Sequence, residues 1–443
     1  MTARLFLIVA ALGSWAAIAS AEETVPTDPK DGRAAEEDTS KPGEIGSSFQ
    51  RPRIALRGLS LLFDQLPSTN LEISPEGGIA IYRDQGDFTL HIGGRLLIDA
   101  ARYFEDKNDL GENFGLADAR LELQGIFRKD LAYRFSGGIF ASSDGGKISI
   151  KDLYVRYLGL RPFFVTAGQQ AEPFSLEAGT STKRVTFMQR GLPNAFAPGD
   201  TFGLAIEGSG DRWHAKGGIF LGDGASQKDQ GDQGKGITGR VTAQPIARAS
   251  SSLFIGGSFS LRNTGFDDDV QFENRPEMSL TEIRYVNTGS ITGATSIRRL
   301  GVEAVAIWGP YSVQAEYMRA RVPRANFGDP EFHGWYVFAS WFPTGESRNY
   351  SLRTGNFRPI APKHDYGAIE LAARYSSIDL TSETVFGGEE KNVTFGVNWY
   401  VRPRIRLMAN YVLVWADENA NDNGTVLGND SPQALMFRFQ IHF

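Results

Sequence analysis

The sequence predicts an all-β protein, a transmembrane antiparallel β-barrel of about 16 strands with one constriction loop folded into its lumen. Three observations lead to this prediction. Apolar and polar residues alternate with a period of two from about residue 77 to the end, the connections between the alternating runs come in two lengths, and aromatic residues gather where the runs end. The 443 residues include no cysteine, which excludes disulfides and thiolate metal sites.

Residues 1–21 are expected to be a cleaved signal peptide. Arg4 supplies a positive charge, Leu5–Leu12 forms an apolar core, and Ala19-Ser20-Ala21 matches a small-x-small cleavage site. The alternative is an N-terminal membrane anchor. Gly13 and Ser14 interrupt the apolar run, which makes it marginal for a span of about 20 residues.

Residues 22–75 are expected to form a flexible acidic N-terminal segment in the periplasm. The first part, residues 22–50, carries eight acidic and three basic side chains and shows no apolar periodicity. The remaining chain is close to neutral, so a basic nucleic-acid surface is not indicated and no nucleic-acid partner is expected.

Residues 76–443 contain the alternating runs of the predicted barrel. In one run, Val393, Phe395, Val397 and Trp399 oppose Thr394 and Asn398, as expected of a strand between lipid and water. The predicted strands are 87–104, 114–128, 131–142, 147–158, 161–170, 201–209, 212–222, 236–245, 251–262, 297–308, 311–321, 332–342, 367–378, 391–401, 405–415 and 433–443.

The connections alternate between tight turns, such as Gly309-Pro310, and long polar loops, such as Asn263–Arg298 and Asp417–Pro432. Short turns at one end and long loops at the other are typical of outer-membrane barrels. An even number of strands places both chain ends at the short-turn end. Pro343–His364 is long for that end, and we expect it to fold inward.

Aromatic residues at the strand ends are typical of rings at the membrane interface. They are Tyr103, Phe104, Trp308, Tyr311, Trp341, Phe342, Trp399, Tyr400 and Trp415. The last strand, Leu435–Phe443, also alternates and ends in phenylalanine, which resembles the assembly signal of bacterial outer-membrane barrels.

The constriction loop is predicted at about residues 171–199, where the alternation stops between two regular runs. A connection this long is usually functional or disordered. Its apolar residues, Phe174, Leu176, Phe187, Met188, Leu192 and Phe196, are too many for a disordered tether, so the loop is expected to pack inside the barrel and narrow it.

Motifs of catalysis and metal binding are missing from the sequence. The five histidines are scattered, and no His-Glu-x-x-His, Gly-x-Ser-x-Gly or phosphate-loop pattern occurs. We therefore expect a non-enzyme without a cofactor, with a barrel-type lipase or protease as the minor alternative.

Charged side chains on the polar strand faces point to the lumen. The bases are Arg95, Arg120, Arg134, Arg156 and Arg374 on strands and Lys183, Arg184 and Arg190 in the loop; acids such as Asp99, Asp118, Glu122 and Asp152 accompany them. Guanidinium groups in a narrow passage attract anions. The alternative is that bases and acids pair across the wall and brace the barrel.

Several stretches resemble the phosphate-selective porin family, the porin O/P family of Gram-negative outer membranes. They include Pro173-Phe174-Ser175-Leu176-Glu177, Thr186–Phe196, Lys151-Asp152-Leu153-Tyr154-Val155 and Glu370–Ser376 within about Gly93–Phe443. The resemblance implies a sixteen-stranded homotrimeric anion channel whose third external loop folds inward. It also implies lumen positions for Arg95, Lys183, Arg184, Arg190 and Asp152.

Two positions depart from the phosphate-binding members of that family. Ala117-Asp118 stands where they carry two arginines, and Asp200 follows Pro198-Gly199 where bases are common. An acid near a constriction reverses the local field.

We therefore predict an outer-membrane porin for passive diffusion of small solutes, with phosphate-like anions as permeants, outer-membrane lipid around it and a homotrimeric assembly. The channel or anion-pathway residues are Arg95, Arg120, Lys183, Arg184, Arg190 and Asp152. The alternatives are a weakly selective general porin and a non-conducting structural or adhesive barrel.

Overall fold

The computed structural model describes residues 69–73, 78–83, 87–111, 114–140, 148–222, 234–248, 250–265, 269–382 and 384–443. The chain divides into two units, Met1–Pro52 and Arg53–Phe443, and every described residue belongs to the second. The predicted signal peptide and most of the predicted acidic segment lie outside the described residues.

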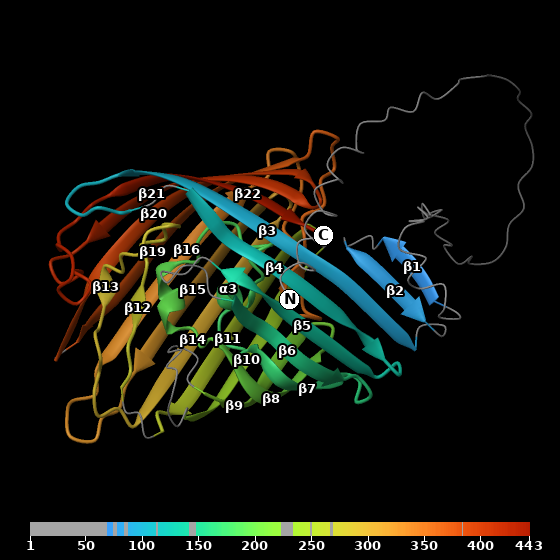
Figure 1. The fold of residues 1–443 in the computed structure, drawn as a ribbon, viewed down its shortest axis with the longest axis horizontal. Helices are drawn as coiled ribbons and strands as arrows, with labels where there is room; N and C mark the ends of the chain where they lie inside the picture. Colours follow the sequence, from blue (N-terminus) through green and yellow to red (C-terminus); the bar gives the residue numbers. More distant parts are fainter. Residues whose placement is uncertain are drawn as a thin grey trace, which may run out of the picture. The chain divides into compact units, whose positions relative to one another are not determined.

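A closed antiparallel barrel of 16 strands forms the body of the second unit (Figure 1). Each strand pairs with the next barrel strand along the chain, and β22 pairs with β3 to close the ring. The strands are β3 (Phe88–Phe104), β4 (Phe114–Phe127), β5 (Leu131–Phe140), β6 (Ile148–Tyr157), β7 (Phe163–Ala171), β8 (Asp200–Ser209), β9 (Trp213–Leu221), β10 (Lys235–Ala247), β11 (Ser251–Asn263), β14 (Ser296–Trp308), β15 (Tyr311–Arg321), β16 (Glu331–Trp341), β19 (Ala368–Ser382), β20 (Val385–Arg402), β21 (Ile405–Ala416) and β22 (Gln433–His442).

Alternation along the strands directs apolar side chains outward and mostly polar side chains into the lumen, as predicted. On β14, Val302 exposes 58% of its surface, whereas the following residue, Glu303, exposes 8%. Near the short-turn end, the rings of Trp308, Tyr311 and Trp341 form a row on the outer wall with neighbouring centroids 6.2 Å apart. Such a belt suits the level of lipid headgroups. Phe342, which we expected in this belt, is buried instead.

The described helices include none that is long and apolar enough to span a membrane.

The C-terminal residue closes the seam between the first and last barrel strands. The amide of Phe443 donates to the carbonyl of Gly94 at 3.0 Å, and the amide of Gly94 donates to the carbonyl of Phe443 at 2.8 Å. A Cβ atom at Gly94 would lie 2.7 Å from the Arg120 carbonyl oxygen and 2.8 Å from the Phe443 ring, so the close approach requires glycine.

A two-stranded hairpin extends the sheet beyond β22. β1 (Thr69–Ile73) pairs with β2 (Ile79–Arg83), and β2 pairs with the first residues of β3. This hairpin corrects the sequence analysis, which placed residues 69–73 in the flexible segment. β22 pairs with β3 only from Arg95 onward. The backbone groups at the start of β3 would otherwise be unpaired on this edge, and β2 pairs with them.

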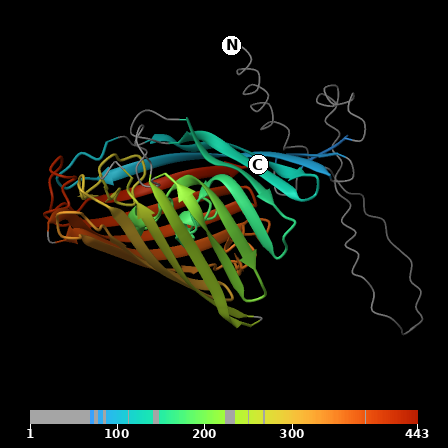
Figure 2. The same ribbon diagram turned by 90° about the horizontal axis from the view of Figure 1, so that it is seen from below.

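Three long connections fold inward; α3, β12 and β13, which belong to two of them, are labelled in Figure 1, and Figure 2 shows the same barrel from below. The constriction loop, residues 171–199, contains α3 (Leu176–Gly179) and the 3₁₀-helix η2 (Leu192–Phe196). The long loop 264–295 contains β12 (Glu273–Asn274) and β13 (Val286–Asn287). The segment 342–367 enters from the short-turn end and contains β17 (Tyr350–Ser351) and β18 (Asn356–Phe357), in agreement with the expected inward fold.

β19 and β20 are longer than predicted. We expected them to end at residue 378 and to restart at residue 391, but they continue to Ser382 and from Val385. The extensions are stable because Leu380 and Val385 are buried in the apolar cluster inside the barrel.

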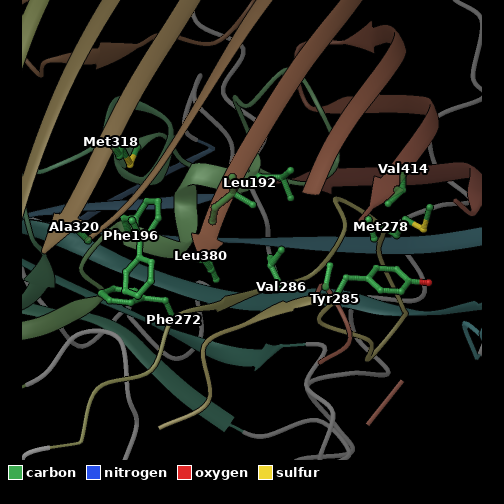
Figure 3. Close-up of a cluster of buried hydrophobic side chains, with 14 of the residues drawn as sticks. Leu192, Phe196, Phe272, Met278, Tyr285, Val286, Met318, Ala320, Leu380 and Val414 are labelled. Carbon is green, nitrogen blue, oxygen red and sulfur yellow. The ribbon is translucent and has the colours of Figure 1, made fainter. Parts of the chain in front are cut away.

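The apolar cluster fills part of the lumen near the long-loop end (Figure 3). Its members come from η2, from the loop 264–295 and from strand faces that point inward: Leu192, Phe196, Phe272, Met278, Tyr285, Val286, Met318, Ala320, Leu380 and Val414. Burial of each large apolar side chain contributes about 1.5–3 kcal/mol. The cluster therefore holds the two inserted loops against the wall and closes this part of the lumen to water.

Candidate functional site

A cavity of about 2080 Å³ lies inside the barrel beside the constriction loop. At the short-turn end it is lined by Arg161, in the turn between β6 and β7, and by Arg402, the last residue of β20. At the other end it reaches Gln271 and Asn274 of the loop 264–295. We refer to this cavity as the passage.

The constriction loop lies against one wall of the barrel, from β15 to β22. The amides of Leu176 and Glu177 donate to the two carboxylate oxygens of Glu316 on β15 at 2.9 and 2.8 Å. Arg406 on β21 donates to the Val185 carbonyl at 2.7 Å, and Arg438 on β22 donates to the Met188 carbonyl at 2.9 Å. Because the loop is fixed to this wall, the passage lies between the loop and the opposite strands.

The inserted segment 342–367 meets the constriction loop inside the barrel. The Asn356 side chain donates to the Gly179 carbonyl at 2.7 Å and accepts from the Thr180 hydroxyl at 2.6 Å. Arg184 donates to the Phe357 carbonyl at 2.9 Å. The passage is thus narrowed by segments that enter from both ends of the barrel.

Two arginines of the facing wall share one carboxylate. On β3, Arg95 Nε donates to Asp118 Oδ2 at 2.9 Å, and on β4, Arg120 Nη2 donates to the same oxygen at 3.1 Å. Arg95 also donates to the Ser181 hydroxyl of the loop at 3.0 Å. Arg95 therefore joins wall and loop at one side of the passage.

Lys183 extends from the loop to the same wall. Its Nζ lies 3.0 Å from Glu122 Oε2, and Arg134 lies 3.5 Å from that oxygen and 2.9 Å from Asp152. Burial lowers the pKa of the Lys183 ammonium, and the attraction of Glu122 opposes this effect. The bases and acids here form a charged network across the passage.

Arg190 supports the loop from within. Its guanidinium donates to the carbonyls of Glu177, Ala178 and Thr180 at 3.0, 3.2 and 3.0 Å. These carbonyls lie in and just after the last turn of α3, where few helical amides remain to donate to them; the Glu177 carbonyl also accepts from the Thr180 amide at 3.1 Å. Arg190 therefore fixes the shape of the loop while its side chain also lines the passage.

A sequence model of the family described as "Phosphate-selective porin O and P" matches residues 90–443 of this chain. The chain belongs to this family. It is 27% identical over 418 residues to Porin O of Pseudomonas aeruginosa, an alignment that covers 84% of this chain and 93% of that protein. It is thus an outer-membrane porin of the Gram-negative type. In barrels of this type the short turns face the periplasm.

Solved structures share the fold of this porin. An anion-selective porin from Comamonas acidovorans superimposes with a TM-score of 0.51 at 15% identity, over 80% of this chain and 100% of that one. OmpF of Salmonella typhi, in a complex with daunomycin, superimposes with a TM-score of 0.52 at 13% identity, over 82% and 100%.

All six residues that the sequence analysis assigned to the pathway line the passage of the porin: Arg95, Arg120, Asp152, Lys183, Arg184 and Arg190. Asp118 is buried on the lumen side of β4 but is not among the lining residues, and Asp200 forms an ion pair with Lys151 at 3.2 Å.

Many basic residues of the passage were not predicted from the sequence. Among the described residues, seventeen bases and seven carboxylates line it. The bases are Arg95, Arg120, Arg134, Lys151, Arg156, Arg161, Lys183, Arg184, Arg190, Lys216, Arg240, Arg348, Arg353, Arg358, Arg402, Arg404 and Arg406; the acids are Glu122, Asp152, Glu172, Asp200, Glu207, Glu273 and Glu370. Alternation could have assigned Arg240 to the lumen. The arginines of segment 342–367 gave no such signal, because that segment has no regular pattern.

Proposed function

We propose that this porin is anion-selective and passes small anions such as phosphate by passive diffusion. The excess of ten positive charges along the passage is the observation that carries the proposal. Guanidinium and ammonium groups in a confined aqueous path replace part of the hydration of an anion, and they repel cations. The family is described as phosphate-selective, which supports phosphate as the permeant.

Acids near the loop favour a second candidate, a general porin with weak selectivity. Asp118 pairs with two arginines, and Asp200 pairs with Lys151. Each pair reduces the field that a passing ion meets. The two candidates differ in whether phosphate binds in the passage or merely diffuses through it.

Current measurements in planar lipid bilayers test the proposal. In a KCl gradient, the reversal potential of the purified porin should show preference for chloride. Addition of phosphate should reduce the chloride current, and this block should saturate as the phosphate concentration rises. Anion preference without a phosphate block would favour the general porin, cation preference would contradict anion selectivity, and a silent bilayer would favour a non-conducting barrel.

The homotrimer belongs to the same proposal and rests on membership of the family. Native mass spectrometry in detergent should show three copies, and a single copy in mild detergent would contradict it. We also retain the cleaved signal peptide as a proposal. N-terminal sequencing of the mature protein should begin at Glu22, directly after the Ala19-Ser20-Ala21 site.

A further inference from the structure

We propose that a groove on the outer wall of the barrel binds one acyl chain of a glycerophospholipid from the periplasmic leaflet. The groove lies directly behind the wall that carries the constriction loop. This inference does not depend on which ions the passage conducts, because it concerns the lipid-facing surface.

The groove has a volume of about 600 Å³ and extends from Trp308 on β14 to Leu435 on β22. It crosses seven neighbouring strands of the ring: β14, β15, β16, β19, β20, β21 and β22. Its outward-facing side chains are aromatic or aliphatic, so an apolar occupant is expected.

The groove arises because a row of large side chains lies beside a row of small ones. The large residues are direct partners across three strands: Tyr311, Trp341 and Leu371. The small residues lie two positions further from the short turns and are also direct partners: Val313, Ala339 and Ala373. Small side chains let another molecule approach the backbone closely, and the large row encloses it on one side.

The end of the groove at the short turns indicates where the occupant has its polar group. Trp308, Tyr311 and Trp341 line this end, and they are the rings that suit the level of lipid headgroups. A molecule with a polar head at these rings and an apolar chain in the groove matches both features. A glycerophospholipid of the periplasmic leaflet has this form.

The depth of the groove matches one leaflet. Trp341 is the last residue of β16, whereas Leu435 lies seven residues before His442, the last residue of β22. Seven residues rise about 23 Å along a strand, or roughly 16 Å along the barrel axis at a tilt of about 45°. Half of the hydrocarbon core of a bilayer is about 15 Å deep.

A second copy of the barrel fits the groove less well than an acyl chain. Outward side chains of a strand are about 7 Å apart, so a neighbouring wall offers separate projections. An acyl chain is a continuous string of methylenes that makes dispersion contacts along the whole groove. Because the surrounding lipid is equally apolar, this close packing is what favours the bound position.

The strands of the groove hold the constriction loop on their inner face. Asn410 lies beneath the groove, and its side-chain oxygen accepts from the Met188 amide of the loop at 3.3 Å. Gly396 also lies beneath the groove, and a Cβ atom there would be 3.1 Å from the Phe187 ring. A single layer of backbone thus separates the acyl chain from the loop, and the chain supports the wall on which the loop packs.

Photo-crosslinking of the wild-type porin tests the site directly. The porin is reconstituted in phosphatidylethanolamine that carries a diazirine in the middle of one acyl chain, irradiated and digested. Cross-links should concentrate on the peptides of β16 and β19 that contain Ala339 and Ala373. Labelling spread evenly over the outward residues of the whole barrel would overturn the proposal.

A variant that fills the groove tests retention of the lipid. Ala339→Phe combined with Ala373→Phe adds bulk only on the outside, because both alanines are exposed on the outer wall. Native mass spectrometry should show a retained phosphatidylethanolamine on the wild-type chain and its loss in the double variant. Ala167→Phe is the matched control, since Ala167 is an exposed residue of β7 away from the groove. Equal retention by the double variant, or equal loss in the control, would contradict the site.

Thermal unfolding tests the support that the chain gives to the wall. A ligand that binds the folded state raises its unfolding temperature. Addition of phosphatidylethanolamine to delipidated porin should therefore raise the unfolding temperature of the wild type more than that of the double variant. An equal rise in both would refute this support.

Two measurements distinguish other occupants. The chain has no cysteine, so Ala373→Cys introduces a single thiol in the groove. Oxidation that links two copies through this thiol would show that a second barrel occupies the groove, and would overturn the proposal; a thiol that stays unlinked supports it. Native mass spectrometry of porin extracted from outer membranes should find phospholipid, and lipopolysaccharide in its place would contradict a lipid of the periplasmic leaflet.

Discussion

Arg374 on β19 and Glu177 in the constriction loop form an ion pair with 3.2 Å between Nη1 and Oε1, and their side chains are 1% and 5% exposed. The same guanidinium pairs with Glu277 of the loop 264–295. One arginine of the wall thus binds both loops that enter from the extracellular end. The position of the constriction is therefore fixed by buried charge pairs as well as by apolar packing.

Replacement of Arg374 by glutamine should loosen both loops. Removal of one partner from a buried ion pair costs about 3–5 kcal/mol, since the other charge stays buried. We expect a lower thermal unfolding temperature and a larger, noisier single-channel conductance. Arg319→Gln is the control, because Arg319 pairs with Glu331 on the exposed outer wall, where ion pairs contribute about 0–1 kcal/mol. Equal stability losses in both variants would contradict the anchoring role.

Replacement of Lys183 and Arg184 by glutamate should reduce anion preference. Both side chains line the passage, and the change reverses two charges there. We expect the anion-to-cation permeability ratio to fall roughly three- to thirtyfold, because each partly exposed charge contributes up to about 1 kcal/mol. Lys129→Glu is the control, since Lys129 lies in an exposed turn with Asp87. A ratio that stays at the wild-type value in the double variant would refute their role.

Anion preference should decline at alkaline pH because Lys183 loses its proton. Burial lowers the pKa of its ammonium. As the pH rises, Lys183 therefore loses its positive charge at a lower pH than an exposed lysine does. Glu122, Arg95 and Arg134 are its charged neighbours. Reversal potentials recorded from about pH 7 to 10 should drift in the wild type. Lys183→Arg, which keeps its charge throughout, should drift less; identical curves would exclude Lys183 as the titrating group.

Replacement of Gly94 by alanine should impair closure of the barrel. The new Cβ would press on the Arg120 carbonyl and the Phe443 ring, and overpacking of this kind costs about 1–3 kcal/mol. The folded fraction can be measured from the change in gel mobility on heating. Gly257→Ala is the control, because the nearest atom to its Cβ would be 3.9 Å away. Normal folding of Gly94→Ala would show that the seam can relax.

The strands were predictable because lipid and water impose opposite demands on successive residues. β21 spans Ile405–Ala416 against a predicted 405–415, and β15 matches its prediction at both ends. The constriction loop was predictable for the converse reason. Its alternation stops while its apolar content stays high, so its apolar side chains must be buried inside the barrel.

The contacts inside the lumen were not predictable from the same patterns. Alternation assigns Arg95, Arg120 and Asp118 to the inner face, but it does not say that two arginines share one carboxylate. The apolar cluster also breaks the simple rule, because Met318 and Ala320 face inward on β15 where polar residues are expected. The loop 264–295 supplies their partners, and its sequence has no period that would indicate this.

The seam between β3 and β22 has a consequence for biogenesis. Asp99 and Arg438, which form a buried pair across it, are 339 positions apart in the chain. The barrel can close only when the whole polypeptide has been exported, because the first barrel strand, β3, pairs with the last, β22. Until then β3 presents an unpaired edge to other chains. Before closure, this open sheet is therefore prone to aggregate with copies of itself.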